Sequence, residues 1–488
     1  MKNRRRGLCL RPQIDLLDDR CLLSGLTPAQ LTAAYGLNAI TFTSSSGTTV
    51  KEAGSGVTIA LIEAYNDPTI VSDLHTFDQA FNLPDPNLTV VNQSGGAVSA
   101  SAQTNSGWTE EESLDVEWAH AIAPEANILV VEANSQSIQD LLAAVNTARN
   151  TPGVVAVSMS WGFPETPNET SYDSYFTTPP GHQGITFIAS SGDNGSLAGA
   201  SYPAASPNVL SVGGTTLLLS SSGAYQSESA WTDSGSGYSK YEPEPSYQAK
   251  VQDTGYKATP DVAFDGDPNT GVPVYVTQTT RNGTQGSWLT FGGTSLGSPA
   301  WAGIIAITDQ GRALAGKGSL DGPTQTLPSL YAAPSSDFHK VAPASSSFGG
   351  GGGYGYGYGY GAFGSSSWYY GGSGLGESAT TSSSSTGANT ATGLGSPNGP
   401  ALVSGLVAST LTTPLTPVTG SGGGTTSPAP TPPTNPVGGG SGHHHRPTHH
   451  GSRTVKSGKT HTEAPARSRH VAQVSVPTKL STDRSLRD

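Results

Sequence analysis

The order of hydrophobic and polar residues predicts strands and helices that alternate along much of the chain. Residues 128–131 and 154–157 are apolar without alternation, which is typical of strands that are buried on both faces of a sheet. Between such runs, apolar residues recur at the spacing of amphipathic helices. We expect strands at residues 57–63, 88–91, 127–132, 154–160 and 185–189, and helices at 72–81, 111–122 and 138–149. This alternation predicts an α/β fold that is doubly wound, with a mostly parallel sheet and helices on both faces.

The residues at both ends of this region predict helices. Thr27 can cap a helix that begins at Pro28, because the N–H that proline lacks would be unpaired at that position. A last apolar helix follows residues 391–400 and reaches about Val407. Between residue 190 and the strand that precedes Ser295, the pattern is irregular. We therefore predict a folded domain over residues 25–410.

Three segments differ from this domain in composition. Residues 1–24 begin with a basic cluster, and charged residues interrupt the Leu-rich sequence that follows. We interpret them as an N-terminal targeting segment, because residues 17–24 resemble a short motif of exported bacterial proteins. Residues 349–386 contain a glycine run, Gly-Tyr repeats and a Ser/Thr stretch, so we predict a low-complexity surface insertion. Residues 411–488 are rich in Pro, Thr and Gly, then basic and His-rich, and we predict a disordered tail.

The tail leaves two other interpretations open. Its basic residues could contact anionic polymer at a cell surface, and the histidines of residues 443–450 could bind a metal. A disordered tail without a partner fits the composition better than either.

Charge and cysteine content exclude several classes of protein. Of the 24 Lys and Arg and 36 Asp and Glu, residues 31–410 hold 9 and 30, which is a net charge of −21. A domain with this charge repels nucleic acid at neutral pH, and its net charge approaches zero in acid. No run of apolar residues is long enough to cross a bilayer. The two cysteines, Cys9 and Cys21, precede the domain, so it has neither a disulfide framework nor a cysteine metal site.

Ser295 stands where a nucleophilic serine is usually placed. Apolar residues lead into Gly292 and Gly293, and Thr294 and Ser295 then precede an apolar helix. The glycines permit a tight turn that projects the hydroxyl, with the helix N-terminus behind it. We expect Pro299 in the first turn of that helix. A Gly-Thr-Ser turn before any buried helix would, however, look alike.

A serine nucleophile needs a base, and no histidine is well placed to serve. Seven of the 11 histidines lie beyond residue 440. The other four are His75, His120, His182 and His339, and none stands in a His-Gly-Thr setting. Each fits a surface or core position better than a catalytic one.

Three carboxyls offer an alternative to histidine. Glu111 and Asp115 are four residues apart on a predicted helix, so their Cβ atoms lie about 5–6 Å apart on one face. They could form a solvated acidic first turn, or, if they are covered, a pair that shares a proton and acts as base and then acid. Asp193 follows a buried strand between glycines, either as an ordinary turn residue or as a protonated donor to an oxyanion.

These motifs together resemble the sedolisin family of serine-carboxyl peptidases. The matching residues are Glu111, Leu114 and Asp115, then residues 191–193, then Gly293, Thr294, Ser295 and Pro299, with support from residues 158–162, 27–36 and 392–397. The resemblance covers about residues 25–408. It implies a subtilisin-like fold with Ser295 as nucleophile, Glu111 as general base, Asp115 as orienting carboxyl and Asp193 as oxyanion donor. It also implies that Glu63 and Trp161 support Glu111.

The chain departs from the family pattern at three places. Family members usually carry a large N-terminal prodomain, whereas here the mature-like sequence starts almost at once, so we expect self-inhibition to be absent or achieved differently. The family binds calcium through two aspartates, and Lys340 and Asn389 stand at the corresponding places. We expect the calcium site to be lost, no cofactor to be required, and the ammonium of Lys340 to fill the cation position. The insertion lies between these two positions.

The sequence as a whole predicts a secreted endopeptidase that acts on proteins or peptides in acid. We expect it outside the cell or at the cell surface. The alternative is a catalytically inactive surface-binding protein on the same fold, which the lost prodomain and metal site favour and the four active-site residues oppose. A histidine-dependent subtilisin would need a histidine in place of Glu111 and an asparagine in place of Asp193.

Overall fold

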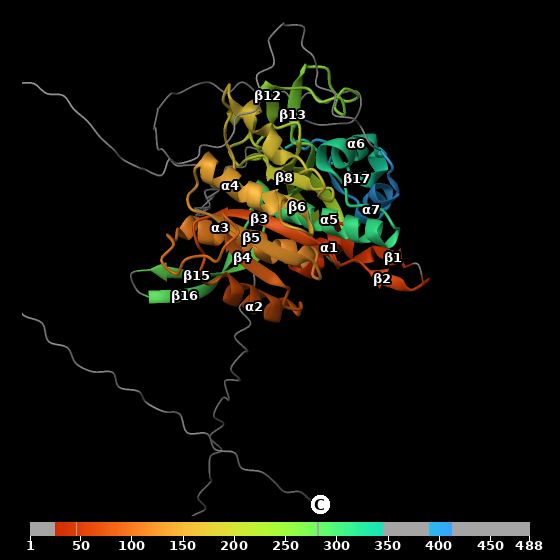
Figure 1. The fold of residues 1–488 in the computed structure, drawn as a ribbon. Coiled ribbons are helices and arrows are strands. Elements are labelled where there is room, and N and C mark those ends of the chain that lie inside the picture. Colours follow the sequence, from red (N-terminus) through yellow and green to blue (C-terminus); the bar gives the residue numbers. More distant parts are fainter. Residues whose placement is uncertain (1–24, 45, 281–282, 345–389, 412–488) are drawn as a thin grey trace, which may run out of the picture. The chain divides into compact units, whose positions relative to one another are not determined.

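An eight-stranded sheet organises the computed structural model of this chain (Figure 1). The structure describes residues 25–44, 46–280, 283–344 and 390–411, so the predicted targeting segment, insertion and tail lie outside the described residues. From one edge to the other the strands are β11 (Tyr225–Ala230), β10 (Val209–Leu219), β8 (Thr186–Ser190), β6 (Val154–Met159), β3 (Thr58–Ala64), β5 (Asn127–Ala133) and β4 (Leu88–Asn92), while β14 (Val262–Asp265) also pairs with β10. The strand pairs are parallel except that of β10 and β11.

The two faces of this sheet are covered by different helices. Alternate residues of a strand point to opposite faces. Ile59 and Leu61 of β3 therefore join the half of the core that contains α3 (Ser106–Ile122) and α5 (Thr294–Leu314). Ala60 and Ile62 join the half that contains α4 (Ile138–Arg149). Helices on both faces of a mostly parallel sheet confirm the predicted α/β fold.

Smaller elements surround this sheet. A further helix, α2 (Ile70–Phe81), packs against α3, and the hairpin of β15 (Val272–Thr280) and β16 (Gly283–Phe291) lies beside both helices (Figure 1). The other strands are β1 (Thr41–Thr43), β2 (Thr49–Lys51), β7 (Phe163–Pro164), β9 (Ser201–Tyr202), β12 (Gly237–Pro243), β13 (Tyr256–Thr259), β17 (Phe338–His339) and β18 (Ser396–Pro397), and the other α-helices are α1 (Pro28–Ala34), α6 (Leu327–Ala332) and α7 (Gly399–Ala408). Short helical turns occur at Leu37–Ala39, Glu169–Phe176, Ser196–Ala198, Gly322–Thr326 and Ser335–Asp337.

Two expectations about elements were wrong. The region after residue 190 is not irregular, because it supplies β10, β11 and β14 to the central sheet. The pair Gly213–Gly214 interrupts the apolar pattern of β10, and β14 is only four residues long. The helix predicted from Glu111 begins at Ser106, because the side chain of Asn105 accepts hydrogen bonds from the N–H groups of Gly107 and Trp108. Glu111 therefore lies beyond the first turn.

Hydrogen bonds join the two ends of the domain through a buried glutamate. The hydroxyl of Tyr35, which follows α1, donates to Glu228 Oε1 at 2.7 Å. Ser396 of β18 donates to the other carboxyl oxygen of Glu228. Tyr35 also accepts a hydrogen bond from the N–H of Asp265 at 2.9 Å. The N-terminal and C-terminal motifs thus contact one structural centre.

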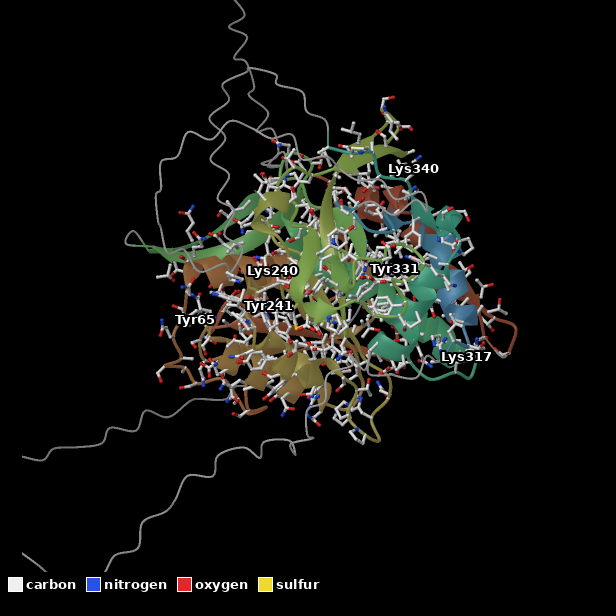
Figure 2. All side chains as sticks on the ribbon, turned by 90° about the horizontal axis from the view of Figure 1, so that it is seen from above. Tyr65, Lys240, Tyr241, Lys317, Tyr331 and Lys340 are labelled. Carbon is white, nitrogen blue, oxygen red and sulfur yellow. The ribbon has the colours of Figure 1, made fainter. Side chains whose placement is uncertain are left out.

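A second polar centre is a fully buried ion pair. Lys257 Nζ lies 2.9 Å from Asp261 Oδ2 and donates to the carbonyl of Val209 at 2.7 Å. Asp261 Oδ1 accepts from Gln248 Nε2 at 3.0 Å and from the hydroxyl of Tyr331, labelled in Figure 2, at 2.8 Å. The network ties β13, β10, β14 and α6 together.

Removing the cation of this pair is expected to destabilise the fold strongly. Lys257→Met leaves Asp261 buried without its counter-charge, which costs about 3–5 kcal/mol of unfolding free energy at neutral pH. Denaturant unfolding of this variant and of Lys240→Met, which changes an exposed lysine, measures the difference. A loss below about 1 kcal/mol at neutral pH contradicts this account of the network.

Candidate active site

The folded part holds many more buried acids than buried bases. The buried acidic residues are Glu52, Glu63, Asp67, Asp73, Asp78, Glu111, Glu112, Asp115, Glu117, Glu132, Glu169, Glu228, Glu242, Asp261, Asp265, Asp267, Asp309 and Asp337. The buried basic residues of the described ranges are His120, Lys257 and Arg312, and they lie beside Asp78, Asp261 and Asp309. Most buried carboxyls therefore have no cationic partner, and burial without one favours the protonated form.

Helix α3 brings two of these carboxyls to one place. Glu111 and Asp115 are one turn apart and are 6% and 0% exposed. The alternative of a solvated acidic turn is therefore wrong. Helix α5 packs closely on α3, because a Cβ at Gly303 would lie only 2.6 Å from Ile122 Cγ2. The missing side chain at Gly303 allows the two helices to approach.

Ser295 lies at the start of α5, directly after the turn that the glycines form. Gly293 has φ +102°, a conformation that side chains rarely adopt, and its N–H donates to the carbonyl of Gly266. Ser295 is the second residue of α5 and is 4% exposed. Its N–H belongs to the first turn of the helix, where N–H groups have no acceptor within the helix. The hydroxyl and the N–H of Ser295 can thus both contact the same bound group.

The Ser295 side chain lies near the carboxyl of Glu111. Burial raises the pKa of Glu111 well above its usual value, and the nearby carboxyls of Asp115 and Asp193 raise it further, whereas the Ser295 side chain lowers it. A carboxyl with a raised pKa is a stronger base once it ionises. The roles of Ser295 as nucleophile and Glu111 as its base stay predictions.

Asp115 stands behind Glu111 and is bonded to two other side chains. Burial raises its pKa to about 8, whereas hydrogen bonds from Ser160 and Glu63 lower it. Burial also raises the pKa of Glu63 well above its usual value, and Asp115 raises it further. Two bonded carboxyls that both resist ionisation share a proton. Glu63, Asp115 and Glu111 thus form a proton-holding row beside Ser295.

Ser160 links this row to the nucleophile's backbone. Its hydroxyl lies 2.8 Å from Asp115 Oδ2 and 3.2 Å from the carbonyl of Ser295. That carbonyl needs a partner, because the residue four positions on is Pro299, which has no N–H. Pro299 lies inside α5 and not in its first turn as expected. The sequence analysis missed this role of Ser160, because Ser160 and Pro299 are far apart in the chain.

Asp193 approaches the site from the loop after β8. Its Oδ1 accepts hydrogen bonds from the N–H of Thr294 at 2.8 Å and from the Thr294 hydroxyl at 2.7 Å. Burial raises the pKa of Asp193, although both bonds lower it. A Cβ at Gly293 would lie 2.7 Å from Asp193 Oδ2, so glycine leaves this oxygen free. Because Oδ1 accepts two bonds, a proton on this carboxyl sits on Oδ2, beside the nucleophile's turn.

Thr294 sets the orientation of the Asp193 carboxyl. Its hydroxyl accepts from the N–H of Gly192 at 3.0 Å, so its single hydrogen points to Asp193. We expect Thr294→Val to lower kcat for peptide hydrolysis roughly tenfold, because Asp193 loses one of its two holding bonds. Thr294→Ser keeps the hydroxyl and should stay within about twofold of wild type. Steady-state kinetics in acid test this prediction, and equal activity of the valine and serine variants contradicts it.

Glu63 and Trp161 are the remaining predicted residues. Glu63 is the residue before the last of β3 and bonds to Asp115 rather than to Glu111. Trp161 follows β6, is 1% exposed, and its indole N–H has no hydrogen-bond partner in the described part of the chain. Support of Glu111 by Trp161 stays a prediction.

The four histidines outside the tail make their contacts with residues other than Ser295. His75 pairs with Asp85 at 2.7 Å, and His182 bonds to main-chain carbonyls. His120 is fully buried at 3.2 Å from Asp78, and His339 stacks on Tyr225 at 3.9 Å. Their assignment to surface and core positions is confirmed.

Lys340 and Asn389 stand where the family resemblance implies calcium ligands. Lys340, where the family resemblance implies an aspartate, is exposed and lies on the opposite side of Figure 2 from Tyr65, which follows β3. Within residues 25–344 and 390–411, without the gaps named above, no three His, Cys, Asp or Glu side chains are grouped to hold a metal. Asn389 lies outside the described residues. The loss of calcium, and the place of the Lys340 ammonium, stay predictions.

Comparison with known proteins agrees with this geometry. A family model described as the subtilase family matches residues 92–316. The chain is 30% identical over 326 residues to sedolisin of Pseudomonas sp. (strain 101), covering 61% of this chain and 53% of that protein. A solved structure of Pseudomonas sedolisin, described as a serine-carboxyl proteinase complexed with two molecules of pseudo-iodotyrostatin, matches with a TM-score of 0.60 and 26% identity over 78% of this chain and 97% of its own. The chain is thus similar to sedolisin in both sequence and fold.

These matches show a subtilisin-like fold. Kumamolisin of Bacillus sp. (strain MN-32) is a further relative, 29% identical over 320 residues that cover 59% of this chain and 53% of that protein. The chain thus spans about half the length of these two relatives. A search of the described residues for long apolar helices found none that could cross a membrane.

Proposed function

We propose that this protein is a serine-type endopeptidase that hydrolyses peptide bonds in acid. The nearness of the Ser295 side chain to the buried carboxyl of Glu111 is the observation that carries the proposal. In this proposal a carboxyl with a raised pKa takes the role that a histidine has in other serine peptidases. The similarity to sedolisin and the bonds of Asp193 to Thr294, next to Ser295, support the same chemistry.

Glu111 acts first as a base and then as an acid. Its carboxylate takes the proton of the Ser295 hydroxyl as the oxygen attacks the scissile carbonyl. The protonated Glu111 then gives that proton to the leaving amine, and an acyl-enzyme on Ser295 remains. Water attacks the acyl group with Glu111 again as base. Asp115, which shares a proton with Glu63, orients Glu111 and limits the charge that builds up in the row.

Protonated Asp193 stabilises the negative oxygen of the tetrahedral intermediate. Its Oδ2–H and the N–H of Ser295 are two donors beside the same turn, and donors held in place before reaction are the most effective. The donor is lost when Asp193 ionises, so activity falls as the pH rises. It also falls in strong acid, where Glu111 is fully protonated and cannot accept the Ser295 proton.

Hydrolysis of an unstructured peptide mixture in acid tests the function. Mass spectrometry should find new termini inside the peptides, as expected for an endopeptidase. An acyl-enzyme at Ser295 should be detectable after rapid quenching in acid. Absence of hydrolysis at every acidic pH by folded protein would favour the alternative of an inactive binding protein.

We also propose that the protein works outside the cell, on protein or peptide substrates. The carboxyls that must hold protons suit an acidic medium. Contact of the tail with a cell surface is part of this proposal, although the tail lies outside the described residues.

A further inference from the structure

Glu63, Asp115 and Glu111 are called the catalytic row from here on. Three buried carboxyls that the proposed mechanism does not use lie beside it. Asp67, Glu112 and Glu132 are 3%, 1% and 3% exposed. Each has one buried oxygen without a hydrogen-bond partner in the described chain, namely Asp67 Oδ2, Glu112 Oε1 and Glu132 Oε2. A buried carboxylate oxygen that neither water nor a donor reaches is costly to charge. Burial of these unpartnered oxygens therefore favours the protonated form of the three carboxyls.

The three carboxyls are continuous with the catalytic row. Glu132 of β5 is the register partner of Glu63 of β3, and neighbouring residues of parallel strands point to the same face, with the strands about 4.8 Å apart. Glu112 follows Glu111 on α3, and its pKa responds to the charge of Asp115 as well as to those of Asp67 and Glu132. Glu112 thus stands between the two groups of acids.

Hydrogen bonds connect the same carboxyls to the hairpin that leads to Ser295. The N–H of Asp67 donates to Glu132 Oε1 at 3.1 Å, and Asp67 Oδ1 accepts from the N–H and hydroxyl of Thr69. The same Thr69 hydroxyl lies 3.0 Å from Asp73 Oδ2. Asp73 in turn accepts from the N–H of Thr277 of β15 at 2.7 Å. The connection therefore runs from β5, through the turn between β3 and α2, to the hairpin that precedes α5.

We propose that Asp67, Glu112 and Glu132 form a pH latch that is closed when protonated and opens when ionised. In acid the neutral carboxyls allow the end of β5, the turn before α2 and α3 to pack together. At neutral pH their charges repel one another inside the protein. The repulsion loosens α3, which carries Glu111 and Asp115, and the fold loses stability.

The groups that face the latch are acidic on every side. They are Glu63 from β3, Asp73 from α2, and Asp115 and Glu117 from α3. The three buried bases of the described ranges pair elsewhere. No buried base of the described ranges therefore pairs with the latch.

The direction of the pH effect follows from the raised pKa values. Burial raises the pKa of Asp67 to about 6 and that of Glu132 to about 7, and raises that of Glu112 well above its usual value. Above about pH 4 the folded state thus binds more protons than the unfolded state. With these carboxyls protonated, the folded state has its full stability below about pH 4. It loses this part of its stability as the pH rises through 6 and 7.

Thermal unfolding from about pH 4 to about pH 7.5 tests the latch without relying on the proposed function. It is measured on full-length Ser295→Ala protein with and without Glu112→Gln and Glu132→Gln, since glutamine imitates a protonated glutamate. We expect the melting temperature of the parent to fall across this range and that of the double variant to fall less, so that the double variant melts at least about 5 °C higher at pH 7.5. Near pH 4 the two should agree within a few degrees. Glu125→Gln, which changes an exposed glutamate before β5, should behave as the parent.

Parallel curves for the parent and the double variant contradict the proposal. If the double variant does not fold near pH 4, the single variants are compared in the same way. The infrared band of protonated carboxyls in the parent is a second measurement. If this intensity persists above about pH 5 in the parent and is weaker in each single variant, the latch is supported. If the intensity has disappeared completely below about pH 5, the latch is contradicted.

Discussion

Replacing Ser295 by alanine is expected to lower kcat for peptide hydrolysis in acid by at least about 10⁴-fold, and Glu111→Gln should cost nearly as much. The alanine variant lacks the attacking oxygen. The glutamine variant keeps the shape of Glu111 but cannot accept the Ser295 proton. Because both residues act in one proton transfer, the double variant should be no slower than either single one within about tenfold. Single-turnover kinetics with an unstructured peptide measure all three.

Glu110→Gln is the matched control for this experiment. Glu110 precedes Glu111 on α3, is not part of the catalytic row, and accepts a hydrogen bond from Gln278 that a glutamine can also accept. It should retain activity within about threefold of wild type. All variants should keep the wild-type melting temperature in acid within a few degrees, because Ser295→Ala and Glu111→Gln are neutral at low pH. Turnover by either catalytic variant above about 1% of wild type contradicts the assigned roles.

Removing the carboxyl of Asp193 is expected to have the next largest effect. Asp193→Ala deletes an oxyanion donor and should lower kcat by about 10²–10³-fold with little change in KM. Asp193→Asn should be far less damaging. Its Oδ1 can accept both bonds from Thr294, which leaves the amide N–H₂ where Oδ2 lies, and that group donates at any pH.

The asparagine variant also makes a prediction about pH. Its activity should decline less steeply on the alkaline side than that of wild type, because the donor no longer depends on a proton. Asp233→Asn is the control, since Asp233 is exposed and affects Asp193 only through its charge. Equal losses for Asp193→Asn and Asp193→Ala would falsify the proposed donation from Oδ2.

The sequence was informative wherever one local element fixes the geometry. The spacing of Glu111 and Asp115 sufficed to place them on one helix face, and the glycines before Ser295 indicated the turn. The apolar runs of β3, β5, β6 and β8 were clear, because strands that are buried on both faces need no alternation.

Features that depend on distant partners could not be predicted in this way. Pro299 is tolerated inside α5 because Ser160, which is far away in the chain, bonds to the carbonyl of Ser295. Similarly, only the register of β3 with β5 brings Glu132 beside Glu63. Strand β10 was missed because Gly213 and Gly214 interrupt its pattern, and Gly213 closely approaches Pro260.

The dependence of kcat/KM on pH tests most directly the central claim that a carboxyl, and not an imidazole, deprotonates Ser295. The account predicts a maximum in acid, at about pH 3–5, and a decline to a few per cent of that maximum by about pH 8, as Asp193 and the catalytic row lose their protons. An activity that instead rises through about pH 6.5 to a plateau at neutral pH, as a histidine base would produce, would contradict it.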